Sequence, residues 1–507
     1  MTGVETGHRI DAMRAIPRRS GARGLAGVAA LILAATGCTT SVTPLPDLGH
    51  LYDRAASWRD DERNPVIVIP GVLGAKLVDE DSDRIAWSAF LGSYADPRKP
   101  DGARMVALPM REGAALHELT DGVVPAGVLE SVRVSVLGLP VEQQAYVSIL
   151  RTLGVGGYRD QQLGVAGAID YGDDHFTCFQ FDYDWRRDNV ENAARLHAFI
   201  LEKRAFVKEQ LRERYGIDAK DLRFDIVAHS MGGLLARYYL RYGGVDLPED
   251  GSDPPITWAG ARYVQRLVQV GTPNAGSIAA LRDLVEGTKL SFVLPRYPPA
   301  VVGTMPSIYQ LLPRARHGAV RDAAGDPIEV LERATWERYG WGLASSEQAD
   351  VLARLLPEVD DADTRRRIAL DHLEKTLTRA ARFQRALDVP ATPPYDTLLH
   401  LFAGDARPTP AVVQVENGTG DLVVTVEAPG DDTVLRSSAV MDERVGRDDR
   451  WTPGLESPIA WTDVSFVFTD HLEMTRDPSF TDNILYRLLD APKPRARACS
   501  RDCTPVP

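Results

Sequence analysis

The chain has 507 residues, of which 44% are hydrophobic and 25% charged, and its formal net charge is −13. This apolar fraction can support a sizeable core, and the length suits a single large domain with insertions. The acidic balance argues against a nucleic-acid partner and against a polybasic membrane-binding patch.

The N-terminus has the pattern of an export signal. An apolar run over residues 25–36 follows Arg14, Arg18, Arg19 and Arg23, and Cys38 comes shortly after it. The run is shorter than the roughly 20 residues that a membrane-spanning helix needs, which favours a signal peptide. Ending at a cysteine is similar to a bacterial lipobox, although Ala35 stands where leucine is usual. We therefore expect a signal peptide over residues 1–38, lipidation of Cys38 and a location in the cell envelope. Ordinary secretion, with Cys38 near a conventional cleavage site, is the alternative.

Beyond a linker expected over residues 39–63, strands and helices alternate, which predicts a mostly parallel sheet with helices on both faces. Strands are expected near residues 65–69, 176–183, 222–228, 263–270, 397–403 and 464–468, and helices near residues 142–153, 190–214, 232–242 and 479–489. A hairpin turn signal, Asn417-Gly418, lies between two further strand-like segments. Apolar residues at helical spacing over 370–387 predict a helix packed on the core; a lid that opens at lipid surfaces is the alternative.

The segment over residues 224–236 is the most informative motif. An apolar strand runs into Ala228-His229-Ser230-Met231-Gly232-Gly233, and a helix-forming segment follows. A serine in a tight strand-to-helix turn is the nucleophile elbow of α/β-hydrolases, in which Oγ points out of the sheet toward a histidine. Small flanking residues let the strand and the helix approach closely. We predict an α/β-hydrolase fold with Ser230 as the nucleophile, against the alternative of an ordinary serine at a helix start.

Chain order then selects the partners of the serine. In α/β-hydrolases the acid and then the histidine follow the nucleophile. Asp431 follows a Pro-Gly turn after a predicted strand, and the neighbouring Asp432 is a second credible acid. His471 is the only histidine behind them and follows the last predicted strand. Taken singly, these residues could be a turn former and a surface histidine; together they predict a Ser-Asp-His triad.

An oxyanion hole needs two backbone N–H groups, one just after the nucleophile and one in an early loop. Met231 supplies the first of these. The second is expected at Val72, in the Pro-Gly turn after the strand at residues 65–69. A turn that only terminates this strand is the alternative.

The remaining motifs predict neither a metal nor a cofactor. Cys178 lies in a predicted strand and is expected to be a buried thiol. Cys499 and Cys503 lie in a tail rich in proline and arginine, where an exported protein can form a small disulfide or keep free thiols. Their spacing lacks the further ligands of a zinc site. Residues 79–90 begin like an EF-hand loop but lack its glycine and glutamate.

The set of motifs resembles the lecithin:cholesterol acyltransferase family, which includes lysosomal phospholipase A2 and phospholipid:diacylglycerol acyltransferases. The matching pieces follow the family order and lie at residues 65–74 with Leu77, and at residues 85–87, 183–186, 228–233, 271–273, 430–434 and 471–474. The resemblance implies an O-acyltransferase that takes an acyl group from a phospholipid, with an acyl-enzyme on Ser230. It assigns the acid to Asp431, the base to His471, and the oxyanion donors to Val72 and Met231. A lipase or phospholipase that only hydrolyses is the alternative.

Two tryptophans also match the family. Trp87 resembles a lid tryptophan that contacts the scissile ester, although a packed side chain is an equal alternative. For Asp184, Trp185 and Arg186 we favour a structural role, with Arg186 paired to a carboxylate beneath the site, over substrate contact. The animal members carry a disulfide-bounded lid, whereas residues 75–100 contain no cysteine.

The expected organisation is a hydrolase domain over residues 64–490, with cap insertions near 75–145 and 280–395, and a tail over 491–507. Membrane lipids are the expected substrate, and the lipid anchor is the expected link to the membrane surface. A catalytically inactive hydrolase fold used as a binding module is the contrasting hypothesis. The intact Ser-Asp-His set argues against it. The motifs leave the acyl chain, headgroup, acceptor and oligomeric state open.

Overall fold

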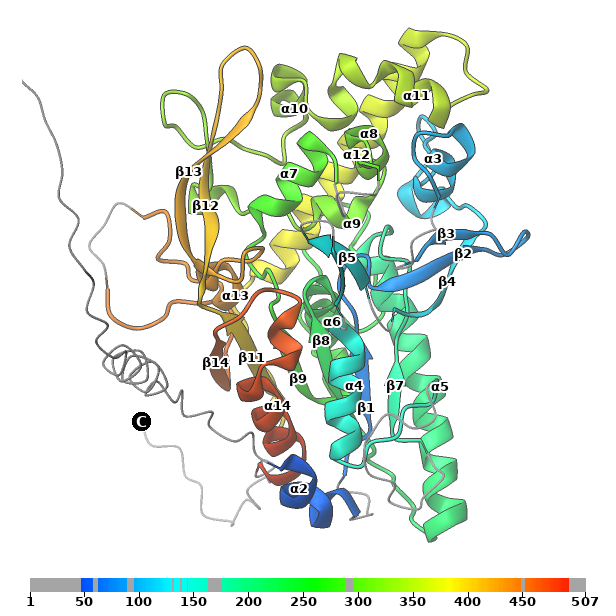
Figure 1. Ribbon diagram of the computed structural model, residues 1–507, viewed down its shortest axis with the longest axis vertical. Helices are drawn as coiled ribbons and strands as arrows, with labels where there is room; N and C mark the ends of the chain where they lie inside the picture. The colour runs from blue at the N-terminus through cyan, green and yellow to red at the C-terminus, as the bar shows by residue number, and fades with distance from the viewer. Residues whose placement is uncertain are drawn as a thin grey trace, which may run out of the picture. The chain divides into compact units, whose positions relative to one another are not determined.

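In the computed structural model the chain divides into two units at Asp47, and the fold described here begins at Leu48 (Figure 1). The predicted signal peptide with Cys38 and the tail with Cys499 and Cys503 lie outside the described residues. The residues that the structure describes are 47–57, 63–88, 95–129, 132–136, 139–143, 145–162, 176–288, 295–447 and 452–491.

A six-stranded sheet forms the centre of the fold, with the strand order β14-β11-β9-β8-β1-β7. Every neighbouring pair in it is parallel, and all six strands expected from the sequence belong to it. The strands are β1 (Val66–Ile69), β7 (Cys178–Gln180), β8 (Phe224–His229), β9 (Val264–Val270), β11 (Leu398–Gly404) and β14 (Asp463–Val467). This sheet and its helices confirm the α/β-hydrolase fold.

The order of the sheet reverses beside β1. The chain passes from β1 outward to β7 and then returns to pair β8 with the other side of β1. In open α/β sheets, ligands bind beyond the carboxyl ends of the strands at such a switch point. The position of β8, which leads to Ser230, therefore already places the serine where a ligand site is expected.

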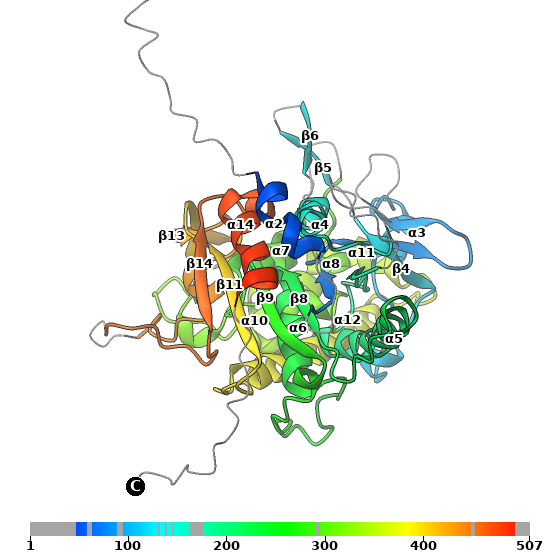
Figure 2. The same ribbon diagram turned by 90° about the horizontal axis from the view of Figure 1, so that it is seen from below.

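Helices cover both faces of the sheet because neighbouring residues of a strand point to opposite sides. Val66 and Val68 of β1 pack with α4 (Ala145–Val155) and α14 (Pro478–Leu485). Ile67 and Ile69 pack on the opposite face with α5 (Asn189–Tyr215) and α6 (Met231–Tyr242). Figure 2, seen along the layers, shows the sheet between these two groups of helices.

Part of the segment expected as a linker over residues 39–63 is helical. Residues 48–57 form the helix α2 (Leu48–Ser57), whose Tyr52 packs with α4 and α14. Ala56 is fully buried, and a Cβ at Gly157 would lie 2.5 Å from its carbonyl oxygen. Tyr52 and Ala56 lie one helical turn apart and so share a face. A single buried turn is too short for the sequence pattern to reveal.

Two insertions lie above the carboxyl edge of the sheet (Figure 1). The first contains β2 (Ala75–Asp79), β3 (Ile85–Trp87), α3 (Pro100–Val106), β4 (Val123–Val128), β5 (Val132–Val136) and β6 (Leu139–Gln143). The second contains α7 (Ile278–Glu286), α8 (Pro299–Val302), α9 (Pro306–Tyr309), β10 (Val320–Arg321), α10 (Arg333–Tyr339), α11 (Ala349–Leu355) and α12 (Ala362–Asp388). Short 3-10 turns are η1 (Leu116–Glu118), η2 (Ala259–Arg262), η3 (Ala315–His317), η4 (Gly342–Ala344), η5 (Ser346–Gln348) and η6 (Glu473–Arg476), and a π turn follows α14 at η7 (Tyr486–Asp490).

Helix α12 carries the apolar stripe and is packed inside the molecule. Leu373 and Leu377 are at most 1% exposed. Two buried arginines of α6, Arg237 and Arg241, donate hydrogen bonds to carbonyl groups at the C-terminal end of α12. Cations at this end of a helix are favoured because the helix dipole is negative there. The stripe therefore packs onto the core, as the first of the two interpretations predicted.

A hairpin leads the chain to the acid. β12 (Arg407–Val415) and β13 (Leu422–Gly430) pair antiparallel around the Asn417-Gly418 turn, and α13 (Arg436–Val440) follows.

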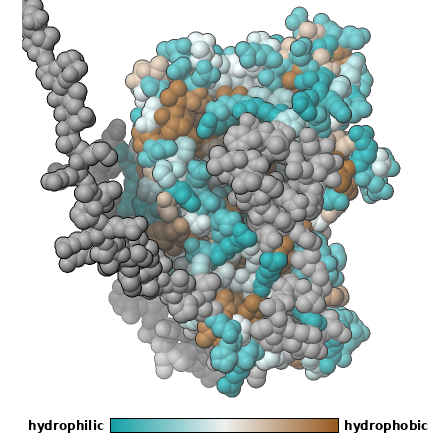
Figure 3. Space-filling view, viewed as in Figure 1, coloured by the Kyte–Doolittle hydropathy of each residue, from teal (hydrophilic) through white to brown (hydrophobic). Residues whose placement is uncertain are grey.

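The surface in Figure 3 is mostly hydrophilic, with smaller apolar patches between the polar groups. Among the helices of the described ranges, none is both long and apolar enough to cross a bilayer.

Candidate active site

Ser230 stands in a strained turn between β8 and α6. Its φ of 54° and ψ of −126° lie in a region that side-chain-bearing residues rarely adopt. The turn is held by a hydrogen bond of 2.8 Å from the Ser230 amide to the Val270 carbonyl. A Cβ at Gly233 would lie 1.9 Å from Oγ1 of the buried Thr272. Only glycine at this position lets α6 leave the strand so close to the neighbouring loop.

The structure brings the three residues expected to form a triad into contact. Nε2 of His471 lies 3.0 Å from Oγ of Ser230. Nδ1 of the same ring lies 2.8 Å from Oδ2 of Asp431. The His471 amide also donates to the Asp431 carbonyl at 2.9 Å. A nucleophile, a base and an orienting carboxylate within hydrogen-bond reach of one another are the arrangement that serine acyl transfer requires.

Asp431 is fully buried and is held as a carboxylate. Its Oδ1 accepts hydrogen bonds from the amides of Thr433 and Val434, at 3.0 and 2.6 Å. Burial by itself raises the pKa of Asp431, but the charge and hydrogen bond of His471 and these two amides together bring it below its ordinary value. Asp432 is exposed, and its amide donates to Thr409. The structure thus places Asp431, and not Asp432, on the histidine.

The same ion pair shifts the pKa of His471 in the opposite direction, upward. Burial lowers its pKa, and the charge and hydrogen bond of Asp431 more than offset this, so that the pKa lies above the ordinary 6.5. The carboxylate therefore favours the protonated ring that forms when the base takes up a proton. Because Nδ1 donates to Asp431, Nε2 of the neutral ring is left to accept a proton from Ser230.

The two expected oxyanion donors lie on either side of the serine. The turn after β1 packs directly on it, since a Cβ at Gly71 would lie 2.7 Å from Cβ of Ser230. Val72 follows in this turn, and Met231 is the first residue of α6, where amides have no partner within the helix. Neither the Val72 nor the Met231 amide has an acceptor among the described residues.

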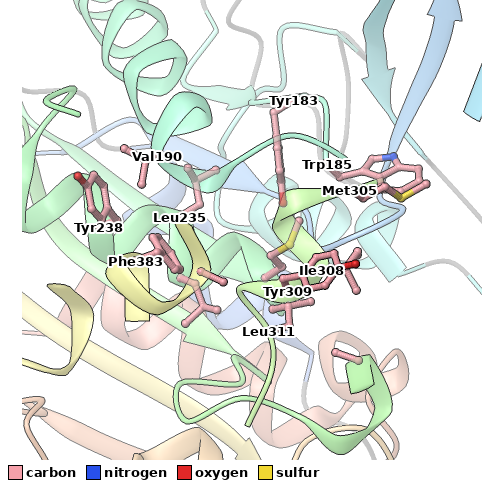
Figure 4. Close-up of a cluster of buried hydrophobic side chains, with 14 of the residues drawn as sticks. Tyr183, Trp185, Val190, Leu235, Tyr238, Met305, Ile308, Tyr309, Leu311 and Phe383 are labelled. Atoms are coloured by element: carbon pink, nitrogen blue, oxygen red, sulfur yellow. The ribbon is translucent and has the colours of Figure 1, made fainter. Parts of the chain in front are cut away.

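An apolar cavity, partly open to solvent, adjoins Ser230. The cavity is also lined by Val72, which lies in the turn after β1, and by Val434, which lies three residues after Asp431. Its other lining residues are Leu73, Trp87, Val106, Trp185, Pro273, Ser277, Ala279, Ala280, Asp283, Thr288, Tyr297, Val302, Met305, Ile308, Leu311 and Thr433. Figure 4 shows several of them, including Trp185, Met305 and Leu311, in the buried cluster. Its apolar lining suits a hydrocarbon chain.

The family-matched tryptophans take part in both packing and the cavity wall. Nε1 of Trp185 donates to the Ala75 carbonyl at 3.1 Å, and Nε1 of Trp87 donates to the Leu73 carbonyl at 2.8 Å. The two rings meet edge to face with centroids 5.6 Å apart. Each indole is thus fixed through its N–H group and turns ring surface toward the cavity.

Arg186 lies behind this wall. Its guanidinium is fully buried and pairs with Asp184 at 2.7 Å and with Asp121 at 2.9 Å. These two carboxylates neutralise the charge of Arg186, which is therefore not available to bind a substrate. The contacts of Asp184 and Arg186 are those of a structural ion pair, which holds the loop after β7 against the first insertion.

Sequence reasoning missed two polar residues beneath the site, His229 and Tyr146. His229 directly precedes the nucleophile, and its Nε2 lies 3.1 Å from the carbonyl oxygen of His471. The two-residue period of a strand places His229 on the same face of β8 as Val227, which packs with Tyr146. Tyr146 accepts a hydrogen bond from the Gly71 amide at 2.9 Å. No sequence signal links Tyr146, which lies in α4, to the turn after β1.

Within the part of the chain that the structure describes, no three histidine, cysteine or acidic side chains are gathered as a metal site. Cys178 is buried in β7, and this burial raises the pKa of its thiol.

Comparison with known proteins finds a match to one family model. Residues 165–344 match the model of the family described as lecithin:cholesterol acyltransferase. The family resemblance is confirmed. The matched region contains Ser230 and α6, whereas Val72, Asp431 and His471 lie outside it. No curated protein matches the chain.

Several solved structures are similar to this chain at low sequence identity. The crystal structure of the Tle4–Tli4 complex matches 84% of this chain and 98% of that chain, with 15% identity and a TM-score of 0.51. EstA from Clostridium botulinum matches 89% of this chain and 100% of that chain, with 11% identity and a TM-score of 0.32. The mature lipase BlEst2 from Bacillus licheniformis matches 85% of this chain and 94% of that chain, with 10% identity and a TM-score of 0.29.

Proposed function

We propose that this protein is a serine-dependent O-acyltransferase that acts on lipid acyl esters. The family match supports an enzyme of the lipid-ester hydrolase or acyltransferase type. The observation that carries the proposal is the contact chain from Ser230 through His471 to Asp431, at 3.0 and 2.8 Å, beside an apolar cavity. A binding module would not need a strained serine, a base and a buried carboxylate in line.

The mechanism follows from the positions of the atoms. Oγ of Ser230 attacks the ester carbonyl while its proton passes to Nε2 of His471, and Asp431 stabilises the resulting imidazolium. The amides of Val72 and Met231 hold the oxyanion, and each donor of this kind contributes roughly 3–4 kcal/mol to lowering the barrier. His471 then returns the proton to the departing alcohol, for a phospholipid the lyso-lipid, and the acyl group stays on Ser230.

In the second half of the reaction, an alcohol or water attacks the acyl-enzyme. His471 takes its proton, the new ester or free fatty acid forms, and Oγ of Ser230 recovers a proton from His471. Transfer to an alcohol is favoured over hydrolysis when the site excludes competing water. The family match supports transfer, and hydrolysis by a lipase or phospholipase is the second candidate.

The full-length protein and its Ser230→Ala variant separate these functions. Each is incubated with phospholipid vesicles that contain a sterol and other long-chain alcohols, and the lipids are resolved by mass spectrometry. New acyl esters that depend on Ser230 establish the transferase and identify the acceptor. Free fatty acid alone, also dependent on Ser230, establishes the hydrolase. An absence of both products would contradict the proposed function on these lipids.

The proposed location is the cell envelope, with membrane lipids as substrate and Cys38 as the lipid anchor. The pattern of residues 1–38 supports it. Expression in a bacterium fed an alkyne-labelled fatty acid tests it. We expect label on the wild type and none on Cys38→Ala, with loss of the variant from the membrane fraction. An unlabelled wild type in the medium would favour ordinary secretion.

A further inference from the structure

A row of buried contacts runs beneath Ser230 that the triad does not use. The Gly71 amide donates to Oη of Tyr146 at 2.9 Å. This oxygen lies 3.4 Å from Nδ1 of His229, and Nε2 of His229 lies 3.1 Å from the carbonyl oxygen of His471. Tyr146 and His229 are 4% and 1% exposed. The row thus joins the turn that holds Val72 to the main chain of His471.

Only one arrangement of protons satisfies these contacts. A carbonyl oxygen can only accept, so Nε2 of His229 carries the hydrogen. Burial, together with the charge of His471, lowers the pKa of His229 to about 3, which keeps the ring neutral. Nδ1 is therefore an acceptor for the Tyr146 hydroxyl. Burial raises the pKa of Tyr146 to about 12, so this hydroxyl keeps its proton.

The turn after β1 is shaped around the tyrosine hydroxyl. A Cβ at Gly74 would lie 2.7 Å from Oη of Tyr146, and the Gly74 amide closes the turn on the Gly71 carbonyl at 3.2 Å. The Gly71 amide is bonded to Tyr146, and the next amide, that of Val72, has no acceptor among the described residues.

The neutral ring of His229 is also compatible with the positive charge that His471 acquires when it is protonated. The ring centroids of His229 and His471 are 4.8 Å apart. A charged group at this distance would oppose protonation of His471, whereas a neutral donor to its carbonyl group holds the loop without that repulsion. The identity of residue 229 therefore bears on the base as well as on the backbone.

We propose that Tyr146 and His229 are positioning residues that align the oxyanion turn and the His471 loop on either side of Ser230. The inference rests on the proposed function, since it takes Ser230 to be the nucleophile. Neither side chain touches the reacting atoms. Their effect is exerted through the placement of the Val72 amide and the His471 ring, where displacements of about 1 Å can cost on the order of a hundredfold in rate.

The test uses the full-length protein and four variants: Tyr146→Phe, His229→Leu, His229→Gln and Tyr242→Phe. Tyr242 is the matched control, because it is buried at the C-terminal end of α6 and its hydroxyl donates one hydrogen bond of 2.8 Å, to the Ala386 carbonyl of α12. The main readout is the rate at which a fluorophosphonate labels Ser230, which needs no knowledge of the lipid. The melting temperature and the kcat and KM for a p-nitrophenyl ester are measured beside it.

We expect Tyr146→Phe and His229→Leu to lower the labelling rate and kcat by about 10- to 100-fold with KM nearly unchanged. His229→Gln, which can still donate to the His471 carbonyl, recovers most of the rate. Tyr242→Phe lowers the melting temperature by a similar amount to Tyr146→Phe but leaves the labelling rate of the folded protein unchanged.

The outcomes separate the two proposals. If Tyr146→Phe is labelled within twofold of the wild type, or loses rate only as Tyr242→Phe does, the positioning role is wrong. If the wild type is labelled but forms no product from lipids, the proposed substrate class is wrong and the positioning test still stands. A folded wild type that is not labelled at all would overturn both.

Discussion

The hydroxyl of Ser230 lies 3.0 Å from Nε2 of His471, although 241 positions separate the two residues in the chain. They meet because β8 and β14 belong to one parallel sheet and both end at its carboxyl edge. The strained turn holds the serine above this edge, and Asp431 fixes the ring from the other side. The contact thus depends on the whole sheet being formed, and the following expectations test what depends on it.

The neighbouring aspartates give a matched pair of variants for the acid. Asp431→Asn is expected to lower kcat by about a thousandfold to ten-thousandfold, because an amide can no longer orient and stabilise the His471 ring. Asp432→Asn is expected to stay within twofold of the wild type, since Asp432 is exposed and the bond to Nδ1 of His471 is made by Asp431. Ester hydrolysis by the two purified variants measures this. Equal losses in both would remove Asp431 from its assigned role.

The pH dependence of labelling reports on His471. The reaction needs the neutral ring, whereas Asp431 raises the pKa of His471 above 6.5. We therefore expect the fluorophosphonate labelling rate to fall as the pH decreases through a midpoint above 6.5. In Asp431→Asn the midpoint shifts downward, because the stabilising charge is lost. A midpoint well below 6.5 in the wild type would contradict the assigned ion pair.

Gly233 is expected to tolerate no side chain. In Gly233→Ala the new Cβ would lie 1.9 Å from Oγ1 of Thr272, so α6 must shift and carry Ser230 with it. We expect a loss of stability of about 1–3 kcal/mol and a slower labelling rate. Gly122→Ala is the control, since its Cβ would meet its nearest neighbour, Asp79, at an ordinary 3.5 Å. Thermal unfolding and labelling of both variants decide the matter.

The cavity wall should set the chain length that the enzyme accepts. Met305 is 3% exposed and lines the cavity. Met305→Trp fills part of this space and is expected to reduce activity on long-chain p-nitrophenyl esters on the order of tenfold relative to short-chain esters. Met305→Ala is expected to shift the preference in the opposite direction. Parallel changes for all chain lengths would show that the acyl chain lies elsewhere.

Asp283 makes stability depend on pH. Burial at the cavity wall raises its pKa to about 6 from the ordinary 3.8. The folded state therefore holds this proton more tightly than the unfolded state does, and stability is lost as the pH rises from about 4 to about 6. Asp283→Asn removes this dependence and is expected to raise the free energy of unfolding at pH 8 by about 1–3 kcal/mol. Denaturant unfolding at pH 4 and pH 8 measures both effects.

The sequence by itself determined the six sheet strands, the main helices and the elbow at Ser230. Each of these depends on local patterns: alternation of apolar residues, helical spacing, and small residues around a turn. Chain order and family resemblance also singled out Asp431, His471, Val72 and Met231 as candidates. These residues belong to motifs whose chemistry can be read without knowing their distant neighbours.

Only the tertiary structure decided which of Asp431 and Asp432 contacts His471. The side chains of two adjacent residues point in different directions, and the sequence motif does not show which of them points toward the histidine. It also brought together Tyr146, His229 and the turn after β1, which no sequence spacing connects. The same holds for the cavity, whose walls come from both insertions and from the ends of the sheet. Contacts between elements far apart in the chain are set by packing, and packing depends on the whole fold.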